Sequence, residues 1–273
     1  MKISIITATW NSGKTVRDTL ESVLAQSYQN YELIIKDGGS KDDTLAICRE
    51  YEPRFGGRMR IISERDKGIY DAMNQGIAAT TGDVVGILNS DDFYTSDDIL
   101  QTVADQFERT PEIDAVYGDV HYVKEDDTTQ LVRYYSSRSF RRWMMRLGFM
   151  PAHPSFYCRK KVYESLKKEG FHCHENEDED DNRYFDTSYK IAADFENLLS
   201  LIFVNRIKTQ YIQKDFVTMR MGGASSSGAA SHRQINRDHM RAFKENGVYS
   251  NYLLISLRYV YKIGELARGV LQR

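Results

Sequence analysis

The chain has 273 residues, 41% of them hydrophobic, and its 37 Lys and Arg side chains against 39 Asp and Glu leave a net charge of −2. This composition is ordinary for a globular protein and excludes a disordered tail, and the small net charge excludes nucleic acid as an expected partner. Three cysteines without CxxC spacing exclude a disulfide framework and favour a reducing compartment, so we expect a cytoplasmic protein. The first residues lack the pattern of a secretory signal, and no apolar run approaches the roughly 18 residues of a membrane-spanning helix.

The first 120 residues alternate between apolar, β-branched runs and amphipathic runs. The expected strands are residues 3–9, 31–36, 60–63, 83–88 and 115–123. The expected helices are residues 15–26, 44–51, 70–79 and 99–108. This alternation predicts an α/β fold with a mainly parallel sheet, in which ligands bind beyond the carboxyl ends of the strands.

Polar side chains follow four of these strands, in residues 7–11, 37–40, 64–68 and 89–92. Turn chemistry explains any one of these segments, but four at one sheet edge bring carboxylates together, and clustered carboxylates usually need a cation. Carboxylate oxygens suit magnesium or manganese, and such an ion beside hydroxyls and amides suits a nucleoside diphosphate. The absence of GxxxxGK[ST] and of GxGxxG argues against a P-loop NTPase and against dinucleotide binding.

Two stretches resemble a known family. SIITATWNSGKTVRDTLESVLAQSYQNYELIIKDGGSKDDT (residues 4–44) resembles the opening of an inverting family-two glycosyltransferase of the GT-A fold, and SERDKGIYDAMNQGIAATTGDVVGILNSDD (residues 63–92) resembles its middle. In detail the chain is similar to bacterial enzymes that build capsular, exopolysaccharide or O-antigen repeat units. The resemblance implies a GT-A domain over residues 1–225, with a nucleotide-binding half (1–120) and an acceptor and catalytic half (121–225). Residues 226–273 are expected to form a flexible loop and a basic helical extension.

The resemblance also implies the residues that bind the donor. They are Thr7, Thr9, Asn11, Asp37, Asp66, Lys67, Asn74, Asn89, Ser90, Gly222 and Gly223. Hydroxyls, amides and a carboxylate such as Asp37 suit the base and ribose, because a carboxylate accepts the uracil N3–H and the others read the carbonyls. Asn74 is equally typical of an exposed polar residue on a helix. Gly222 and Gly223 open a run that resembles a loop closing over the diphosphate, although its composition is also that of a linker.

The metal motif of the family is Asp-x-Asp, and here it reads Asn89-Ser90-Asp91. Asp91 matches the metal ligand, with Asp92 as a second choice. We therefore expect Mn²⁺ or Mg²⁺ as cofactor, held more weakly because an amide stands at the first acidic position.

The catalytic base is expected in the second half, because an inverting transferase deprotonates the acceptor hydroxyl as it attacks the donor. In FDTSYKIAADFENLLSLIF, Asp194 matches the base of the family, and Glu196 is expected to orient the acceptor. His153, in the segment PAHPS, is expected to contact the sugar or the diphosphate. From the residues alone, Asp194 also suits a helix cap, and a single histidine is often only structural.

The local charges are uneven. From Ser231 to Arg273, eight basic side chains oppose three acidic ones, and residues 251–273 form an expected basic amphipathic helix. Such a helix lies on an anionic membrane at the cytoplasmic face, packs on its own domain, or joins a partner chain, as in a homodimer.

The acidic run 175–181 is expected to be a solvated loop before a strand-like segment, 184–191, and residues 140–145 to be a helix covering the sheet. The neighbouring His172, Cys173 and His174 lack the second cluster that a metal site needs.

These expectations combine into one function: transfer of a sugar from a nucleotide donor, a UDP-sugar, to a saccharide or lipid-linked saccharide in bacterial surface polysaccharide synthesis. Two alternatives stay open. A catalytically idle nucleotide-sugar-binding module is favoured only by Asn89. A nucleotidyltransferase on a similar fold needs a GxGxR-type loop after the first strand, which TATWNSGKT does not supply.

Overall fold

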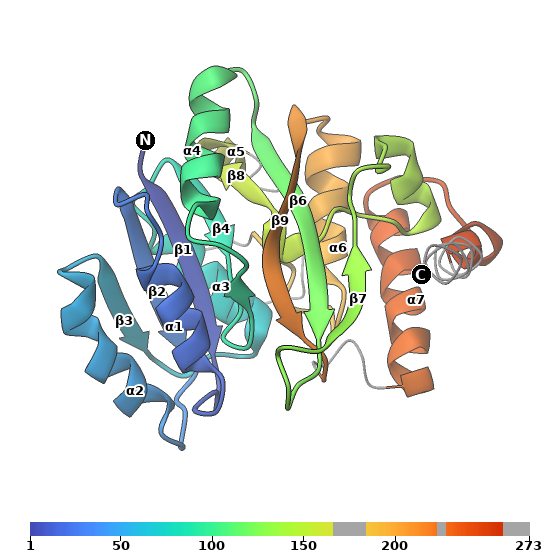
Figure 1. The fold of residues 1–273 in the computed structure, drawn as a ribbon. Coiled ribbons are helices and arrows are strands. Elements are labelled where there is room, and N and C mark those ends of the chain that lie inside the picture. Colours follow the sequence, from blue (N-terminus) through green and yellow to red (C-terminus); the bar gives the residue numbers. More distant parts are fainter. Residues whose placement is uncertain (166–183, 223–227, 259–273) are drawn as a thin grey trace, which may run out of the picture.

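The computed structural model describes residues 1–165, 184–222 and 228–258 (Figure 1). Several segments discussed above lie outside the described residues: His172–His174, the acidic run 175–181, Gly223, the expected boundary at residue 225, and residues 259–273.

The first half contains four parallel strands and four helices that confirm the expected elements. The strands are β1 (Ile3–Thr9), β2 (Tyr31–Asp37), β3 (Met59–Ser63) and β4 (Val84–Ile87). The helices are α1 (Val16–Leu24), α2 (Thr44–Tyr51), α3 (Ile69–Ala78) and α4 (Ile99–Arg109), with a short 3₁₀ helix, η1 (Glu52–Phe55), after α2. The register pairs Thr9 with Asp37 and Asp37 with Ser63, so the carboxyl ends of the first three strands lie level.

Further strands, of both directions, extend the same sheet. The strands are β5 (Phe93–Tyr94), β6 (Ala115–Val123), β7 (Leu131–Tyr135), β8 (Tyr157–Arg159) and β9 (Thr209–Arg220). The strand order is β3-β2-β1-β4-β8-β6-β9-β5, with β7 also paired to β6. β6 and β9 are parallel, whereas β8 runs antiparallel to both β4 and β6, and β5 runs antiparallel to β9. Only β6 among these strands follows from the sequence pattern.

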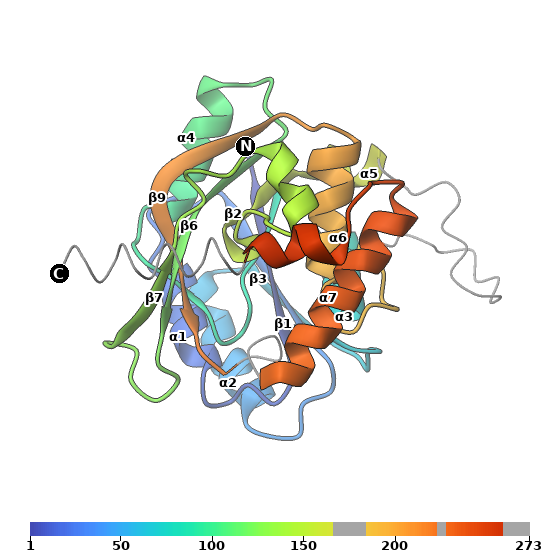
Figure 2. The same ribbon diagram turned by 90° about the vertical axis from the view of Figure 1, so that its right-hand side faces the viewer.

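With one exception, the helices of the second half are shorter than those of the first half. They are α5 (Lys160–Ser165), α6 (Ala193–Leu198), a π-helical turn η4 (Leu199–Val204) and α7 (Gly228–Glu245), with 3₁₀ helices η2 (Arg142–Leu147) and η3 (His153–Ser155). η2 replaces the expected helix at 140–145, and it buries Met144 and Met145 while Trp143 is 60% exposed. The start of the described tail, residues 252–258, is helical as expected and lies beside α7 (Figure 2).

The expectation of a strand-like segment at 184–191 is wrong, because these residues form turns. The side-chain amide of Asn74 occupies backbone groups that a strand would use: it donates to the carbonyl oxygen of Phe185 (2.8 Å) and accepts the N–H groups of Tyr184 (3.1 Å) and Phe185 (2.8 Å).

Two hydrophobic clusters cover the two faces of the sheet. Ile5 of β1 packs into the cluster formed with α1, α2 and α4, and the next residue, Ile6, packs into the cluster formed with α3, α5, α6 and α7. This opposition follows from the alternation of side chains along a strand. Among the described helices, none is both long and apolar enough to cross a membrane.

Candidate active site

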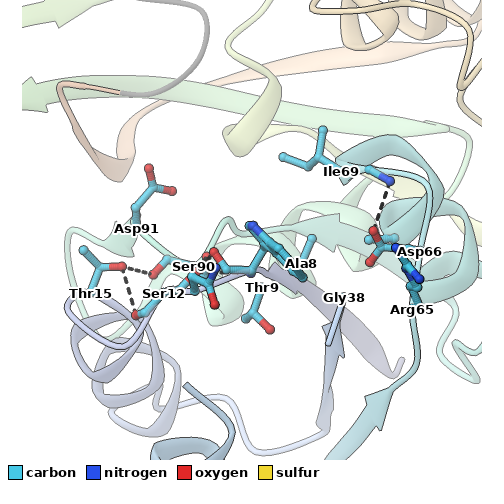
Figure 3. A pocket seen from close by; sticks show the side chains of 14 residues that line it. Ala8, Thr9, Ser12, Thr15, Gly38, Arg65, Asp66, Ile69, Ser90 and Asp91 are labelled. Carbon is cyan, nitrogen blue, oxygen red and sulfur yellow. Dashed lines mark hydrogen bonds between the residues drawn. The ribbon is translucent and has the colours of Figure 1, made fainter. Parts of the chain in front are cut away.

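A cavity of about 630 Å³ opens beyond the carboxyl ends of β1 and β2 (Figure 3). Of the residues expected to bind donor or metal, those that line it are Thr9, Asn11, Asp66, Ser90 and Asp91. They come from the ends of three strands, β1, β3 and β4, so the parallel sheet brings together side chains spread over more than 80 residues, as the position of ligand sites in such sheets requires.

Among the lining residues that were not expected from the sequence, three offer binding surface. Trp10 and Ile69 are 59% and 50% exposed, and Arg65 lies next to Asp66. The Trp10 ring offers a flat surface to a base or sugar ring, Ile69 adds apolar surface, and a guanidinium suits phosphate. The available signal was a tryptophan directly after a buried strand, where the chain leaves the core.

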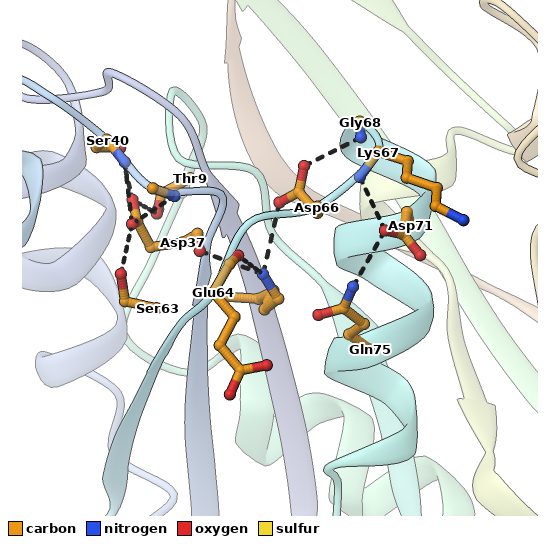
Figure 4. A network of polar contacts seen from close by, with 12 residues as sticks. Thr9, Asp37, Ser40, Ser63, Glu64, Asp66, Lys67, Gly68, Asp71 and Gln75 are labelled. Atoms are coloured by element: carbon orange, nitrogen blue, oxygen red, sulfur yellow. Dashed lines mark hydrogen bonds and ion pairs between the residues drawn. The ribbon is translucent and has the colours of Figure 1, made fainter. Parts of the chain in front are cut away.

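Asp37 does not line the cavity, although its neighbour Gly38 does. Its carboxylate is fully buried and accepts hydrogen bonds from the backbone N–H of Gly39 (2.9 Å) and from the hydroxyls of Ser40 (2.5 Å), Ser63 (2.9 Å) and Thr9 (3.2 Å) (Figure 4). Burial alone would raise the pKa of this carboxyl, but the hydrogen bonds outweigh it and hold the pKa below its ordinary value. Asp37 therefore ties the three strand ends together beneath the cavity.

Asp66 reaches the cavity beside Gly38, and this approach requires glycine. A Cβ on Gly38 would lie 2.6 Å from an Asp66 carboxylate oxygen. Fully buried Lys36 donates to the carbonyl oxygens of Asp37 (3.2 Å) and Glu64 (2.6 Å), and its Nζ lies 3.5 Å from Asp66 Oδ2 (Figure 4). Lys36 thus holds the carboxylate of Asp66 in place, a role that its position inside a strand did not reveal.

The residues at the end of β4 divide into two groups. Ser90 and half-buried Asp91 line the cavity, and Ser90 Oγ lies 2.7 Å from Ser12 Oγ. Asp92 is 2% exposed, lies outside the cavity lining, and accepts a hydrogen bond from the Asn89 amide (3.2 Å). The amide at position 89 therefore donates to a buried carboxylate, which a second aspartate could do only if protonated.

The side chains at the first cavity suit a divalent ion that is held partly by the protein and partly by a bound ligand. In the described part of the chain, no group of three His, Cys, Asp or Glu side chains could hold a metal alone. Mg²⁺ is commonly bound through one or two carboxylates together with substrate phosphates, and Asp91 offers one such carboxylate at the cavity. Burial raises the pKa of Asp91, and a bound cation would reverse this effect.

A second cavity, of about 450 Å³, is lined by the expected base, Asp194, and by His153, which was expected to contact the sugar or the diphosphate. Burial lowers the pKa of His153 to about 4, so this imidazole is neutral at physiological pH. Burial raises the pKa of half-buried Asp194 to about 6, and one oxygen accepts the backbone N–H of Phe195 (2.8 Å). The cap residue of α6 is Ala192, so Asp194 lies within the first turn and does not cap the helix.

The remaining expected residues lie outside both cavity linings. Glu196 is fully buried and accepts a hydrogen bond from Asn246 of α7 (3.0 Å), and Asn74 holds residues 184 and 185 as described above. The others are Thr7, which is fully buried, Lys67, which is exposed, and Gly222, where a Cβ would lie 2.7 Å from Glu125.

Two elements connect the cavities. At the start of α3, Ile69 lines the first cavity, and the hydroxyl of Tyr70 donates to the carbonyl oxygen of Ile191, which lines the second. At the end of β9, Arg220 donates to the carbonyl oxygen of Asp91 (2.6 Å), while the adjacent Met221 lines the second cavity. The two cavities are therefore neighbouring parts of one site.

Solved structures with this fold include two complexes with nucleotide sugars. TarS of S. aureus (residues 1–349, in complex with UDP-GlcNAc) matches with a TM-score of 0.64 and 17% identity, over 89% of this chain and 66% of that one. The mannosyltransferase PcManGT of Pyrobaculum calidifontis, in complex with GDP-Man and Mn²⁺, matches with a TM-score of 0.58 and 13% identity, over 97% of this chain and 80% of that one. The fold is the GT-A fold expected from the sequence.

Curated relatives match less than half of the chain. A PGL/p-HBAD biosynthesis glycosyltransferase of Mycobacterium bovis is 39% identical over 118 residues, which are 43% of this chain and 46% of the relative. The glycosyltransferase GlyG of Streptococcus pneumoniae is 31% identical over 126 residues, which are 46% of this chain and 41% of the relative. The chain spans less than half the length of these two relatives.

The family model described as "Glycosyl transferase family 2" matches residues 4–166, more than half of the chain. The matched segment contains the strand ends that form the first cavity and His153 of the second. The chain belongs to glycosyltransferase family 2.

Proposed function

We propose that this protein transfers a sugar, with inversion, from a UDP-sugar to a saccharide or lipid-linked saccharide used in bacterial surface polysaccharides. One observation carries the proposal: a cavity with nucleotide-suited side chains and Asp91 adjoins a second cavity with a carboxylate whose pKa is about 6. The UDP-GlcNAc complex of TarS and the glycolipid pathway named for the mycobacterial relative support this choice of donor and acceptor classes.

The first cavity would bind the nucleotide. Thr9, Asn11 and Ser90 present hydroxyl and amide groups, and Asp66 presents a carboxylate held by Lys36 that can accept a base N–H or ribose hydroxyl. Asp91 would hold Mg²⁺ or Mn²⁺ with the diphosphate. When bound, this ion would neutralise the negative charge of the diphosphate leaving group.

The second cavity would bind the acceptor. Asp194 would take the proton of the attacking hydroxyl, because a carboxylate with a pKa near 6 is ionised at neutral pH and is a stronger base than an ordinary aspartate. Attack from this side, opposite the nucleotide, inverts the anomeric centre. Neutral His153, in the same wall, would donate or accept a hydrogen bond without adding charge.

The test replaces two carboxylates, Asp194 and Asp91, to which the proposal gives different roles. We expect Asp194→Asn to keep the Kd for UDP with Mn²⁺ within about twofold while kcat falls by about a thousandfold, the scale of general-base catalysis. Asp91→Ala should lose metal-dependent UDP binding as well as transfer. Calorimetry measures the Kd for UDP, and NMR of the product measures both the rate of transfer and the anomeric configuration.

Three results would contradict this function. Retention of configuration would exclude the inverting mechanism, and wild-type turnover by Asp194→Asn would exclude this base. Metal-dependent UDP binding without any donor turnover would instead favour the catalytically idle binding module.

A further inference from the structure

The backbone that leads into α6 is held by one buried carboxylate of α7. Asp238 is 5% exposed, and its Oδ2 accepts hydrogen bonds from the backbone N–H groups of Ile191 (3.1 Å) and Ala192 (3.3 Å). Ala192 is the N-cap of α6 and has no polar side chain of its own to fix the start of the helix. Asp238 therefore supplies this fixation from a position 46 residues further along the chain.

Helix α3 holds the same backbone through a second side chain. The hydroxyl of Tyr70 donates to the carbonyl oxygen of Ile191, whose N–H is already bonded to Asp238. Ile191, Ala192 and Asp194 all line the second cavity. Because Asp194 lies in the first turn of α6, the direction of its carboxylate depends on the backbone that these two side chains fix.

Asp238 also acts on Asp194 through its charge. The third hydrogen bond of Asp238, from the amide of Gln234 (2.7 Å), is like the other two in coming from a neutral donor, so none of the three cancels the charge of the carboxylate. Burial raises the pKa of Asp194 to about 6, and the negative charge of Asp238 adds a smaller effect in the same direction.

Other ionisable groups surround Asp194 without combining these two effects. The hydroxyls of Tyr70 and Tyr122 interact with Asp194 electrostatically, from α3 and β6. The remaining ionisable side chains of the cavity wall are Arg133, Tyr135, His153, His232, His239 and Arg258. Among the groups that the structure describes here, only Asp238 both raises the pKa of Asp194 by its charge and bonds to the backbone directly before α6.

We propose that Asp238 is a positioning residue of the transfer reaction: it fixes the backbone from which Asp194 faces the acceptor, and its charge makes Asp194 a better proton acceptor. When the acceptor hydroxyl loses its proton to Asp194, a carboxylate becomes a neutral carboxyl group, and a neighbouring negative charge favours that change. Asp238 itself does not line the cavity, so it acts through Asp194 and not on the substrate. This inference rests on the proposed function and adds a residue to it.

The first experiment follows the Asp194 carboxyl directly. Carbon-13 NMR of protein labelled at the aspartate carboxyl groups measures its titration, and the resonance is assigned by its loss in Asp194→Asn. Asp238→Asn keeps an oxygen for the two backbone N–H groups and removes only the charge, while the amide of Gln234 can turn to accept the new N–H. We expect Asp194 to titrate at lower pH in this variant than in the wild type.

The second experiment measures transfer, where the two effects of Asp238 separate. Asp238→Ala loses both the charge and the acceptor oxygen, so we expect kcat to fall at least about tenfold while the KM for the donor stays within about twofold. Asp238→Asn should keep kcat at pH 8 within about threefold of the wild type. Its rate at pH 5, relative to pH 8, should rise at least about twofold because Asp194 ionises at lower pH.

Glu245→Gln is the matched control, because it removes one negative charge from the same helix. The carboxylate of Glu245 bonds to the hydroxyl of Tyr189 (2.5 Å) and to Arg241 Nε (2.7 Å) and not to the backbone before α6. This variant should keep the titration of Asp194 and the wild-type kcat.

The proposal is overturned if Asp194 titrates at the same pH in Asp238→Asn as in the wild type, or if Asp238→Ala transfers sugar at the wild-type rate. If Asp238→Ala does not fold, the titration of Asp238→Asn decides alone. Absence of transfer by the folded wild-type protein contradicts the proposed function instead, and the NMR titration then still measures whether Asp238 acts on Asp194.

Discussion

Asp194 owes its raised pKa to burial rather than to a strong neighbouring charge. The groups that face it are the hydroxyl of Tyr70 from α3, the hydroxyl of Tyr122 from β6 and the carboxyl of Asp238 from α7. The backbone N–H groups of the first turn of α6 lower the pKa and partly offset the effect of burial, so that the pKa is about 6. This is the range in which a carboxylate is both ionised in the cell and basic enough to take a proton.

The pH dependence of turnover follows from this value. A raised pKa means that Asp194 stays protonated, and inactive as a base, up to about pH 6. We expect kcat to fall about tenfold for each pH unit below that value and to level off above it. Stopped assays between pH 4.5 and 8 measure this profile, and a rate that is constant across the range would show that another group takes the proton.

Helix α3 contacts both cavities. Its cap residue Gly68 and its first residue Ile69 line the first cavity, while Tyr70 and Asn74 hold the segment that leads into α6 and Asp194. A displacement of α3 would therefore move the wall of one cavity and the support of the other. The sequence pattern predicted the helix, but not that its polar residue Asn74 faces the second half of the chain.

Replacing Asn74 distinguishes a positioning residue from a donor-binding one. We expect Asn74→Ala to lower the free energy of unfolding by about 2 kcal/mol, because buried backbone groups lose their partner. We also expect it to lower kcat at least about tenfold, since misplacing a catalytic group is costly, while the KM for the donor stays unchanged.

Gln75→Ala is the matched control for this variant, because Gln75 lies on the same helix and its amide donates to Asp71 within that helix (3.1 Å). It should leave kcat unchanged. A raised donor KM in Asn74→Ala, with kcat preserved, would instead support the donor contact that the family resemblance implies.

At the scale of the whole molecule, η2 and the helical tail expose aromatic and aliphatic side chains. Trp143 of η2 and Tyr252 and Leu253 of the tail are between 57% and 74% exposed. η2 contacts the residues just before the tail, since Arg146 Nε donates to the carbonyl oxygen of Tyr249 (2.9 Å), and both helices face the viewer in Figure 2. Exposed aromatic and leucine side chains near arginines suit an anionic membrane surface.

Vesicle sedimentation tests this surface. We expect the protein to bind phosphatidylglycerol vesicles more than phosphatidylcholine vesicles, and Leu253→Asp to lower the partition at least about tenfold, because one leucine leaves the bilayer interface and a negative charge is added. Leu131→Asp, at a position of β7 that is 56% exposed, is the control and should bind like the wild type. Equal binding of the Leu253 variant and the wild type would remove this face as the membrane contact.

Much of the fold and part of the site could be predicted from the sequence. The strands β1 to β4 are short, apolar and β-branched, and helices α1 to α4 follow the helical period, so each element shows its burial in its own residues. Asp66 and Asp91 were predicted because the residue after a parallel strand reaches the ligand edge whatever the rest of the chain does. By contrast, most of β9 is only partly buried, and its pattern shows no clear alternation.

Local sequence thus determined the α/β architecture and the strand ends at the first cavity, because periodicity and chain order fix them. The candidate base, Asp194, came from the resemblance to a family and not from these patterns. Only the tertiary structure decided what each polar side chain does. Asp37 bonds to Ser63 at the end of β3, Glu196 bonds to Asn246 near the end of α7, and Arg258 enters the cavity of Asp194 from the far end of the chain. Such partners are distant in sequence, so their hydrogen bonds and burial exist only once the sheet, α6 and α7 have packed together.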